Sequence, residues 1–228
     1  MPESLFLRIS KFLMIIIVPS LVFLLIANFA SFDSSFYRKE FLKYNVYKDV
    51  PQADFLHEKV IKFIDGKSNG MPNAFNQREM QHLEDVRKLI QVSKIVFCIL
   101  VILFLLLAVL SALKLNAKRL IINFFGKVLA FGGILTIAMA VVLLLLVSLD
   151  FSIAFESFHL MFFEKGTYVF DSAKEIIVRL YPEQLFVDIG IRILAWVFIL
   201  SVVVSLSGTF LIFRTKGKKN KNKKEWQF

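Results

Sequence analysis

The chain contains three histidines, the side chains best suited to moving protons near neutral pH: His57, His82 and His159. Their unperturbed pKa of about 6.5 lets each take or give a proton, so two at one site can divide the general-base and general-acid roles. His82 has Glu79 and Asp85 three positions to either side, and on a helix either carboxylate is near enough to orient its ring. His57 lies beside Glu58 with no comparable setting, and we interpret it as a solvated residue.

A metal site is the alternative use of these histidines. The pattern Glu-x-x-His occurs twice, as Glu79 to His82 and as Glu156 to His159, and carboxylate bundles that bind two metal ions use this spacing. Such a bundle also takes carboxylates from other helices inside its core, whereas the long apolar runs of this chain contain none. We therefore predict no metal site.

Other common reaction centres are missing from the sequence. Gly-rich phosphate loops and Gly-x-Ser-x-Gly elbows are absent, which disfavours nucleotide use and ordinary serine-hydrolase chemistry. Cys98 is the single cysteine, and it lies within an apolar run where we expect a small buried thiol. No thiol nucleophile is then available near an outer surface, which removes the thioester route to acyl transfer. We predict no cofactor.

Four long apolar runs are the main structural elements that must position these histidines. The chain is 57% hydrophobic with a mean hydropathy of +0.67, too apolar for a single water-soluble globule. Four runs are long enough to cross a bilayer, and none of them contains Asp, Glu, Lys, Arg or His. They cover residues 12–32, 95–113, 128–149 and 193–213. The sequence therefore predicts an all-α integral membrane protein with four transmembrane helices.

The distribution of charge predicts the orientation of the chain in the membrane. The head 1–11, the turn 114–127 and the basic tail 214–228 together hold 13 Lys or Arg against two Glu. The loops 33–94 and 150–192 hold 15 bases against 16 acids. Because positive loops stay inside, we place the head, turn and tail in the cytoplasm and both loops outside a plasma membrane. The net charge of +10 is thereby explained without a nucleic-acid partner.

The first external loop carries two helical patterns. Apolar positions recur at helical spacing between Pro51 and Gly66, and this amphipathic helix either lies on the bilayer or packs on the rest of the domain. Asn76 with Glu79 resembles a helix cap, and no helix breaker follows before residue 95. We expect this second helix to run into the second transmembrane span.

The second external loop begins with a cluster of aromatic residues around His159, which favours a position at the membrane interface. Ser172 with Glu175 has the spacing of a capping box for a short helix that ends near Tyr181. Pro182 suits the first position of a helix that leads into the last span.

Several stretches of the sequence resemble one known family. They are Phe36-Tyr37, Phe41-Leu42-Lys43-Tyr44, the run Glu-Met-Gln-His-Leu-Glu-Asp-Val at 79–86, Phe-His-Leu-Met-Phe-Phe at 158–163, and Leu180-Tyr181-Pro182. In these stretches, and in their spacing from the apolar runs, nearly the whole chain resembles the lipoprotein intramolecular transacylases, four-span membrane proteins of Gram-positive bacteria. The sequence departs from the family pattern at Tyr168, where a Trp is expected.

The resemblance implies a reaction within one substrate molecule. The acyl chain at glycerol sn-2 of a diacylglyceryl-modified lipoprotein moves to the free α-amine of the same N-terminal cysteine, giving an N-acyl, S-monoacylglyceryl lipoprotein. The family's essential histidines correspond to His82 and His159, which would share the base and acid roles. Supporting candidates are Glu79, Asp85, Tyr37 and Tyr168. The partners would be such lipoproteins and membrane lipids.

Two functions from other classes remain as alternatives. A non-enzymatic membrane sensor or assembly factor would tolerate substitution of both histidines. A metal-dependent interfacial lipid hydrolase would lose activity with a chelator and regain it with metal.

Overall fold

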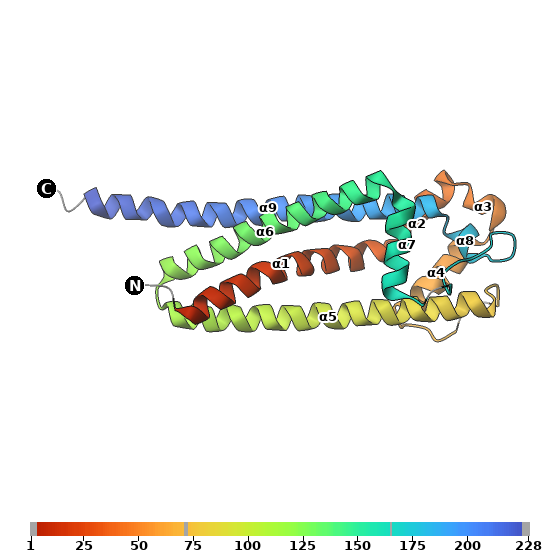
Figure 1. The fold of residues 1–228 in the computed structure, drawn as a ribbon, viewed down its shortest axis with the longest axis horizontal. Helices are drawn as coiled ribbons and strands as arrows, with labels where there is room; N and C mark the ends of the chain where they lie inside the picture. The colour runs from red at the N-terminus through yellow and green to blue at the C-terminus, as the bar shows by residue number, and fades with distance from the viewer. Residues whose placement is uncertain (1–3, 71–72, 165, 225–228) are drawn as a thin grey trace. The chain divides into compact units, whose positions relative to one another are not determined.

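The protein is described by a computed structural model that covers residues 4–70, 73–164 and 166–224, with side chains described up to residue 216. These residues form helices and no strand, which confirms the all-α prediction (Figure 1). In chain order the helices are α1 Leu5–Ser31, α2 Ser34–Lys43, α3 Val46–Asp49, α4 Ala53–Ile64, α5 Gln77–Leu115, α6 Lys118–Leu149, α7 Phe151–Phe162, α8 Ile177–Leu180 and α9 Glu183–Lys224. Part of the predicted basic tail, residues 225–228, lies outside the described residues.

Four helices, α1, α5, α6 and α9, are long and apolar enough to cross a membrane, as the sequence predicts. Each extends beyond its apolar run, because the flanking residues include charged positions but no proline to break the helix. The longest extension at the start of a helix is in α5, whose 39 residues begin at Gln77 and continue through the apolar run at 95–113. His82 therefore lies on the polar first turns of a helix that continues into a span.

The chain divides into two compact units. One takes in the described residues of Met1–Ile26, Phe97–Leu143 and Leu194–Phe228, and it holds most of the four apolar runs. The other takes in Ala27–Val96 and Leu144–Ile193, apart from the residues outside the description, and it holds all three histidines. We call these the apolar unit and the histidine unit.

Small residues allow close packing of helices in the apolar unit. A Cβ placed on Gly208 of α9 would lie 2.6 Å from the carbonyl oxygen of Gly126 on α6, and one on Gly133 would lie 2.8 Å from Ser201 and Ser205 of α9. In lipid, where apolar side chains gain nothing by leaving solvent, such close backbone approach supplies much of the association energy. Cys98 was expected to be buried, but it is exposed. The most apolar window of α5 is only 6% buried by protein, which leaves that surface for lipid.

Gly208→Ala is expected to destabilise the protein by about 1–3 kcal/mol, because the added methyl group overlaps the backbone of α6. Thermal unfolding in detergent measures the effect. Gly190→Ala on the same helix is the control, since a Cβ there meets nothing within 4 Å and alanine is the better helix former. Equal melting temperatures for the two variants would contradict the close approach of α6 and α9.

The core of the histidine unit is built from α2, α3, α4, α8 and the first turns of α5 and α9. Phe41 and Leu180 are fully buried in it. The apolar stripe of α4 lies in the same core, with Leu56 1% and Val60 3% exposed. Of the two placements predicted for this amphipathic helix, the structure therefore shows packing on its own domain.

The segment before α8 departs from the sequence prediction. The carboxylate of Glu175 accepts a hydrogen bond from the backbone N–H of Asp171, not from Ser172, and the carboxylate of Asp171 accepts one from the backbone of Ala173. Asp171 thereby stabilises a turn in place of a first helical turn, because a short carboxylate competes for nearby N–H groups. The predicted short helix is consequently only the single turn α8, which ends at Leu180.

Candidate functional site

The structure brings His82 and His159 together from distant parts of the sequence. His82 lies in the second turn of α5, and His159 lies in the last turns of α7, a helix that the sequence analysis did not predict and that Asp150 caps. The two imidazole centroids are 6.2 Å apart with an angle of 22° between the ring planes. Each residue is 8% exposed. In Figure 1, α7 ends beside α5, as this ring contact requires.

Aromatic rings surround both histidines. Phe163 and Phe170 lie 5.1 and 5.4 Å from the His82 ring, centroid to centroid. Phe155 lies 4.1 Å from the His159 ring, and Tyr168 lies 4.7 Å from it. We call these four residues the aromatic enclosure. It limits the contact of the imidazoles with water, so both rings sit in a medium that disfavours charge.

A backbone hydrogen bond fixes the tautomer of neutral His159. Its Nδ1 lies 2.7 Å from the carbonyl oxygen of Phe155. A carbonyl oxygen only accepts, so Nδ1 carries the proton and donates it. In the neutral ring Nε2 therefore has a free lone pair, which is the state required of a general base.

Burial keeps both imidazoles neutral at physiological pH. His82 precedes the apolar run of α5. Burial, the largest cause, and the charge of His159 together lower the pKa of His82 from 6.5 to about 4, although Asp85 opposes the shift. Burial also lowers the pKa of His159, and the hydrogen bond to the Phe155 carbonyl partly offsets this effect. Nδ1 of His82 is buried without a hydrogen-bond partner among the described residues. Its ring is thus held by packing.

Glu79 does not hydrogen-bond to His82, contrary to the orienting role suggested by its spacing. Its carboxylate is 1% exposed and accepts two backbone N–H groups, that of Asn76 at 2.7 Å and that of Ile177 at 2.7 Å. Asn76 in turn accepts the N–H of Glu79, which completes the predicted cap of α5. Glu79 therefore joins the start of α5 to the start of α8 and fixes the turn of helix that carries His82.

Asp85 acts on His82 only through its charge. Its carboxylate accepts a hydrogen bond from Lys88 at 2.9 Å. It raises the pKa of His82, against the larger effect of burial.

A second buried carboxylate holds the loop that carries part of the aromatic enclosure. Glu175 is 3% exposed and pairs with Arg78 of α5 at 3.1 Å. Arg78 also donates to the carbonyl of Val169 at 2.8 Å and lies over the ring of Phe170. Arg78 and Glu175 thus position Phe170 against His82. No local pattern predicts this pair, because its members are 97 positions apart.

His57 is buried, so its interpretation as a solvated residue is wrong. It is 3% exposed, its ring lies 4.3 Å from that of Tyr37, and its Nδ1 lies 3.0 Å from the hydroxyl of Tyr181. Helical spacing predicts this burial, because His57 shares a face of α4 with Val60 and Ile64. Tyr37, predicted to support His82 and His159, packs in this separate cluster. Tyr168 does contact His159.

Within the described residues, no three His, Cys, Asp or Glu side chains gather into a group able to hold a metal ion. Glu156, one member of the Glu-x-x-His pairs, is exposed. Glu79, the other, uses its carboxylate oxygens on backbone N–H groups.

The fold and the paired histidines define a class of protein: a multi-pass membrane protein with four apolar helices and a helical domain that encloses two neighbouring imidazoles. The family model described as lipoprotein intramolecular transacylase Lit matches residues 12–186. The chain therefore belongs to the lipoprotein intramolecular transacylase family.

Solved structures show the same fold. An in meso structure of the membrane-integral transacylase Lit from Bacillus cereus matches with a TM-score of 0.80 and 19% identity, over 92% of this chain and 97% of that one. A structure of the same protein with a histidine replaced by arginine matches with a TM-score of 0.76 and 18% identity, over 93% of this chain and 94% of that one. No curated protein sequence matches this chain.

Proposed function

We propose that this protein transfers the sn-2 acyl chain of a diacylglyceryl-cysteine lipoprotein to the α-amine of the same cysteine, at the external membrane face. Membership of the transacylase family supports the reaction class. The observation that carries the proposal is the meeting of His82 and His159 inside the aromatic enclosure. One imidazole there can move a proton from the amine to the departing ester oxygen, and the other can donate a hydrogen bond to the oxyanion.

His159 is the general base in this proposal. The neutral α-amine attacks the ester carbonyl carbon, and the new C–N bond forms as Nε2 of His159 takes a proton from the nitrogen. The C–O bond to glycerol then breaks, and the imidazolium returns the same proton to the departing glycerol oxygen. The hydrogen bond from Nδ1 to the Phe155 carbonyl stabilises the transient positive charge and keeps Nε2 aimed away from its own helix backbone.

His82 is the hydrogen-bond donor to the tetrahedral oxyanion. With a pKa of about 4 its cation is scarcely populated at neutral pH, so it acts as a neutral imidazole that donates an N–H. A donor held in place before the reaction stabilises developing negative charge most strongly where water is excluded.

The reaction needs no protein nucleophile, because amine and ester belong to one molecule. Holding the two groups in contact supplies up to about 7–11 kcal/mol of the barrier reduction in favourable cases. Exposed apolar side chains on the same helix as His159, among them Ile153 and Met161, offer a surface for the acyl chains. The lipid then reacts without leaving the bilayer.

Mass spectrometry of lipoprotein N-termini tests the proposal in a host that lacks this gene and then regains it. The N-acyl, S-monoacylglyceryl form should appear only when the gene is present. The proposal would be contradicted if this form appeared without the gene, or if it were absent although the protein was expressed and inserted in the membrane.

The pH dependence of kcat/KM should separate the base from the substrate amine. The free α-amine has a pKa of about 7.7–8.0, so log kcat/KM should fall with a slope near one below that range. A second loss comes from protonation of His159, whose pKa lies below its usual 6.5 because of burial. The slope should therefore reach two only below pH 6.5. A slope of two already at pH 7 would show that the base is not a buried imidazole.

A further inference from the structure

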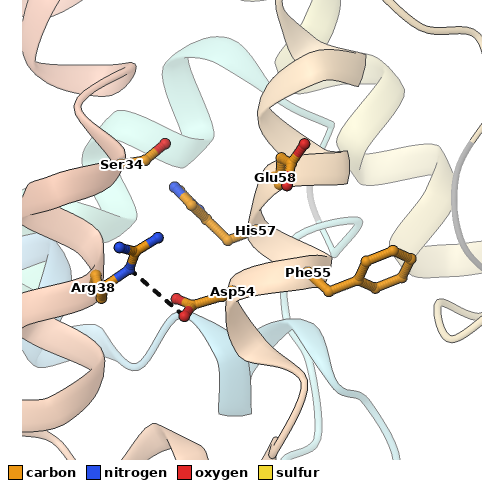
Figure 2. A pocket seen from close by; sticks show the side chains of 6 residues that line it. All are labelled: Ser34, Arg38, Asp54, Phe55, His57 and Glu58. Carbon is orange, nitrogen blue, oxygen red and sulfur yellow. Dashed lines mark ion pairs between the residues drawn. The ribbon is translucent and has the colours of Figure 1, made fainter.

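A hollow separate from the paired histidines lies between α2 and α4. It has a volume of about 460 Å³ and is lined by Ser34, Arg38, Asp54, Phe55, His57 and Glu58 (Figure 2). Figure 2 shows the ring of His57 directed from α4 toward Ser34 and Arg38 on α2. All six residues belong to the histidine unit.

His57 lines this hollow and has one buried ring nitrogen without a hydrogen-bond partner among the described residues. The residue is 3% exposed, and its Nε2 has no hydrogen-bond partner within the described part of the chain. Burial lowers the pKa of His57 to about 4 and raises that of Tyr181 well above its usual value, so both groups are neutral. When the Tyr181 hydroxyl donates to Nδ1, the ring proton is on Nε2. An unmade hydrogen bond of this kind is costly unless a ligand completes it.

The remaining lining residues offer both donors and acceptors. Ser34 and Arg38 donate from α2, whereas Asp54 and Glu58 accept from α4. The Arg38 and Asp54 charges are 3.6 Å apart, and their side chains are 65% and 49% exposed. An ion pair this exposed contributes little to stability, so a ligand can rearrange it at small cost. The two carboxylates disfavour a simple anion and the guanidinium disfavours a simple cation, whereas a peptide group carries an acceptor and a donor side by side.

We propose that this hollow binds the peptide backbone of the lipoprotein substrate downstream of its modified cysteine. The inference rests on the proposed function, because a diacylglyceryl-cysteine substrate necessarily continues as a polypeptide from the cysteine carbonyl. A backbone carbonyl accepts from Nε2 of His57 and from Arg38, and a backbone N–H donates to Asp54 or Glu58. Recognition of the backbone suits an enzyme whose substrates share only their lipid-modified cysteine.

The hollow is within reach of a chain held at the paired histidines. Four successive ring contacts join His57 to His159 through Tyr181, Phe186 and Phe155, with centroid distances of 6.0, 6.4, 5.5 and 4.1 Å. An extended chain spans about 3.3–3.6 Å per residue, so about eight residues suffice to bridge the two sites.

Binding of synthetic lipopeptides to the intact protein in lipid nanodiscs tests this inference. The two probes are diacylglyceryl-cysteine followed by one residue or by eleven residues of uncharged glycine and serine, each with a fluorophore at its end. Fluorescence anisotropy gives the two dissociation constants. For the wild-type protein we expect the long probe to bind about tenfold more tightly, as one or two hydrogen bonds to charged groups provide.

Arg38→Ala should reduce this tenfold preference to near unity, and Lys39→Ala, an exposed neighbour outside the hollow, should retain it. Equal affinities of the wild-type protein for the two probes would overturn the inference, as would a loss in Arg38→Ala that is the same for both, which would indicate lipid-headgroup binding. N-acylation of the short probe by the wild-type protein reports the proposed function separately. Failure of that reaction would leave the length dependence of binding as an independent result.

Discussion

His159→Phe is expected to reduce N-acylation of lipoproteins by about 10³-fold or more while the protein still inserts in the membrane. Phenylalanine retains the ring contacts with Phe155 and Tyr168 but has no Nε2 to take the amine proton. General acid and base catalysis contributes about 10²–10⁴-fold, and here one imidazole performs both transfers. His82→Phe should cause a loss of about 10²–10³-fold, the usual effect of losing one oxyanion donor.

The readout is the ratio of N-acylated to free-amine lipoprotein N-termini by mass spectrometry, at matched protein levels. Ser157→Ala, an exposed change on α7 two residues before His159, is the matched control and should leave the ratio unchanged. Wild-type product levels in either phenylalanine variant would remove that histidine from the mechanism.

Glu79→Ala should produce the largest loss of stability among single substitutions in the histidine unit. It leaves the backbone N–H groups of Asn76 and Ile177 without their acceptor, at a cost of about 2–4 kcal/mol in the free energy of unfolding. For a chain of this length that loss lowers the melting temperature by roughly 10 °C. Thermal unfolding in detergent measures it.

Glu84→Ala, an exposed carboxylate on the same helix, is the control and should change the melting temperature little. Glu79→Gln retains one carbonyl acceptor and should fall between the two. Because Glu79 positions His82 without touching the reacting atoms, variants that stay folded should keep the wild-type pH profile. A shifted profile with unchanged stability would instead make Glu79 part of the proton transfer.

Much of the fold follows from local sequence signals. The four apolar runs predict the long helices, and the Asn76 cap with no later breaker predicts that α5 continues into a span. These features depend on residues within a few turns of one another. The helix α7 was not predicted, although Asp150 is a common type of N-cap residue. The nearly continuous apolar and aromatic residues of α7 obscure a helical period.

The site is less predictable, because its geometry depends on contacts between distant segments. Spacing identified His82 and the family resemblance identified His159, but neither could show that their rings lie 6.2 Å apart. Glu79 meets Ile177 across 98 positions, so its true role as a link between helices is invisible in a local window. The burial of His57 was predictable from the sequence, because His57 has the helical spacing of the buried residues Val60 and Ile64.

In the proposed reaction the acyl chain moves within one lipoprotein molecule, with no acyl-enzyme intermediate. An isotope crossover experiment with the purified protein tests it most directly, using one lipopeptide with heavy acyl chains and a second with a heavy peptide. Mass spectrometry should find each N-acyl group on its own original peptide. A product that combines the heavy acyl chain of the first lipopeptide with the heavy peptide of the second would contradict transfer within one molecule.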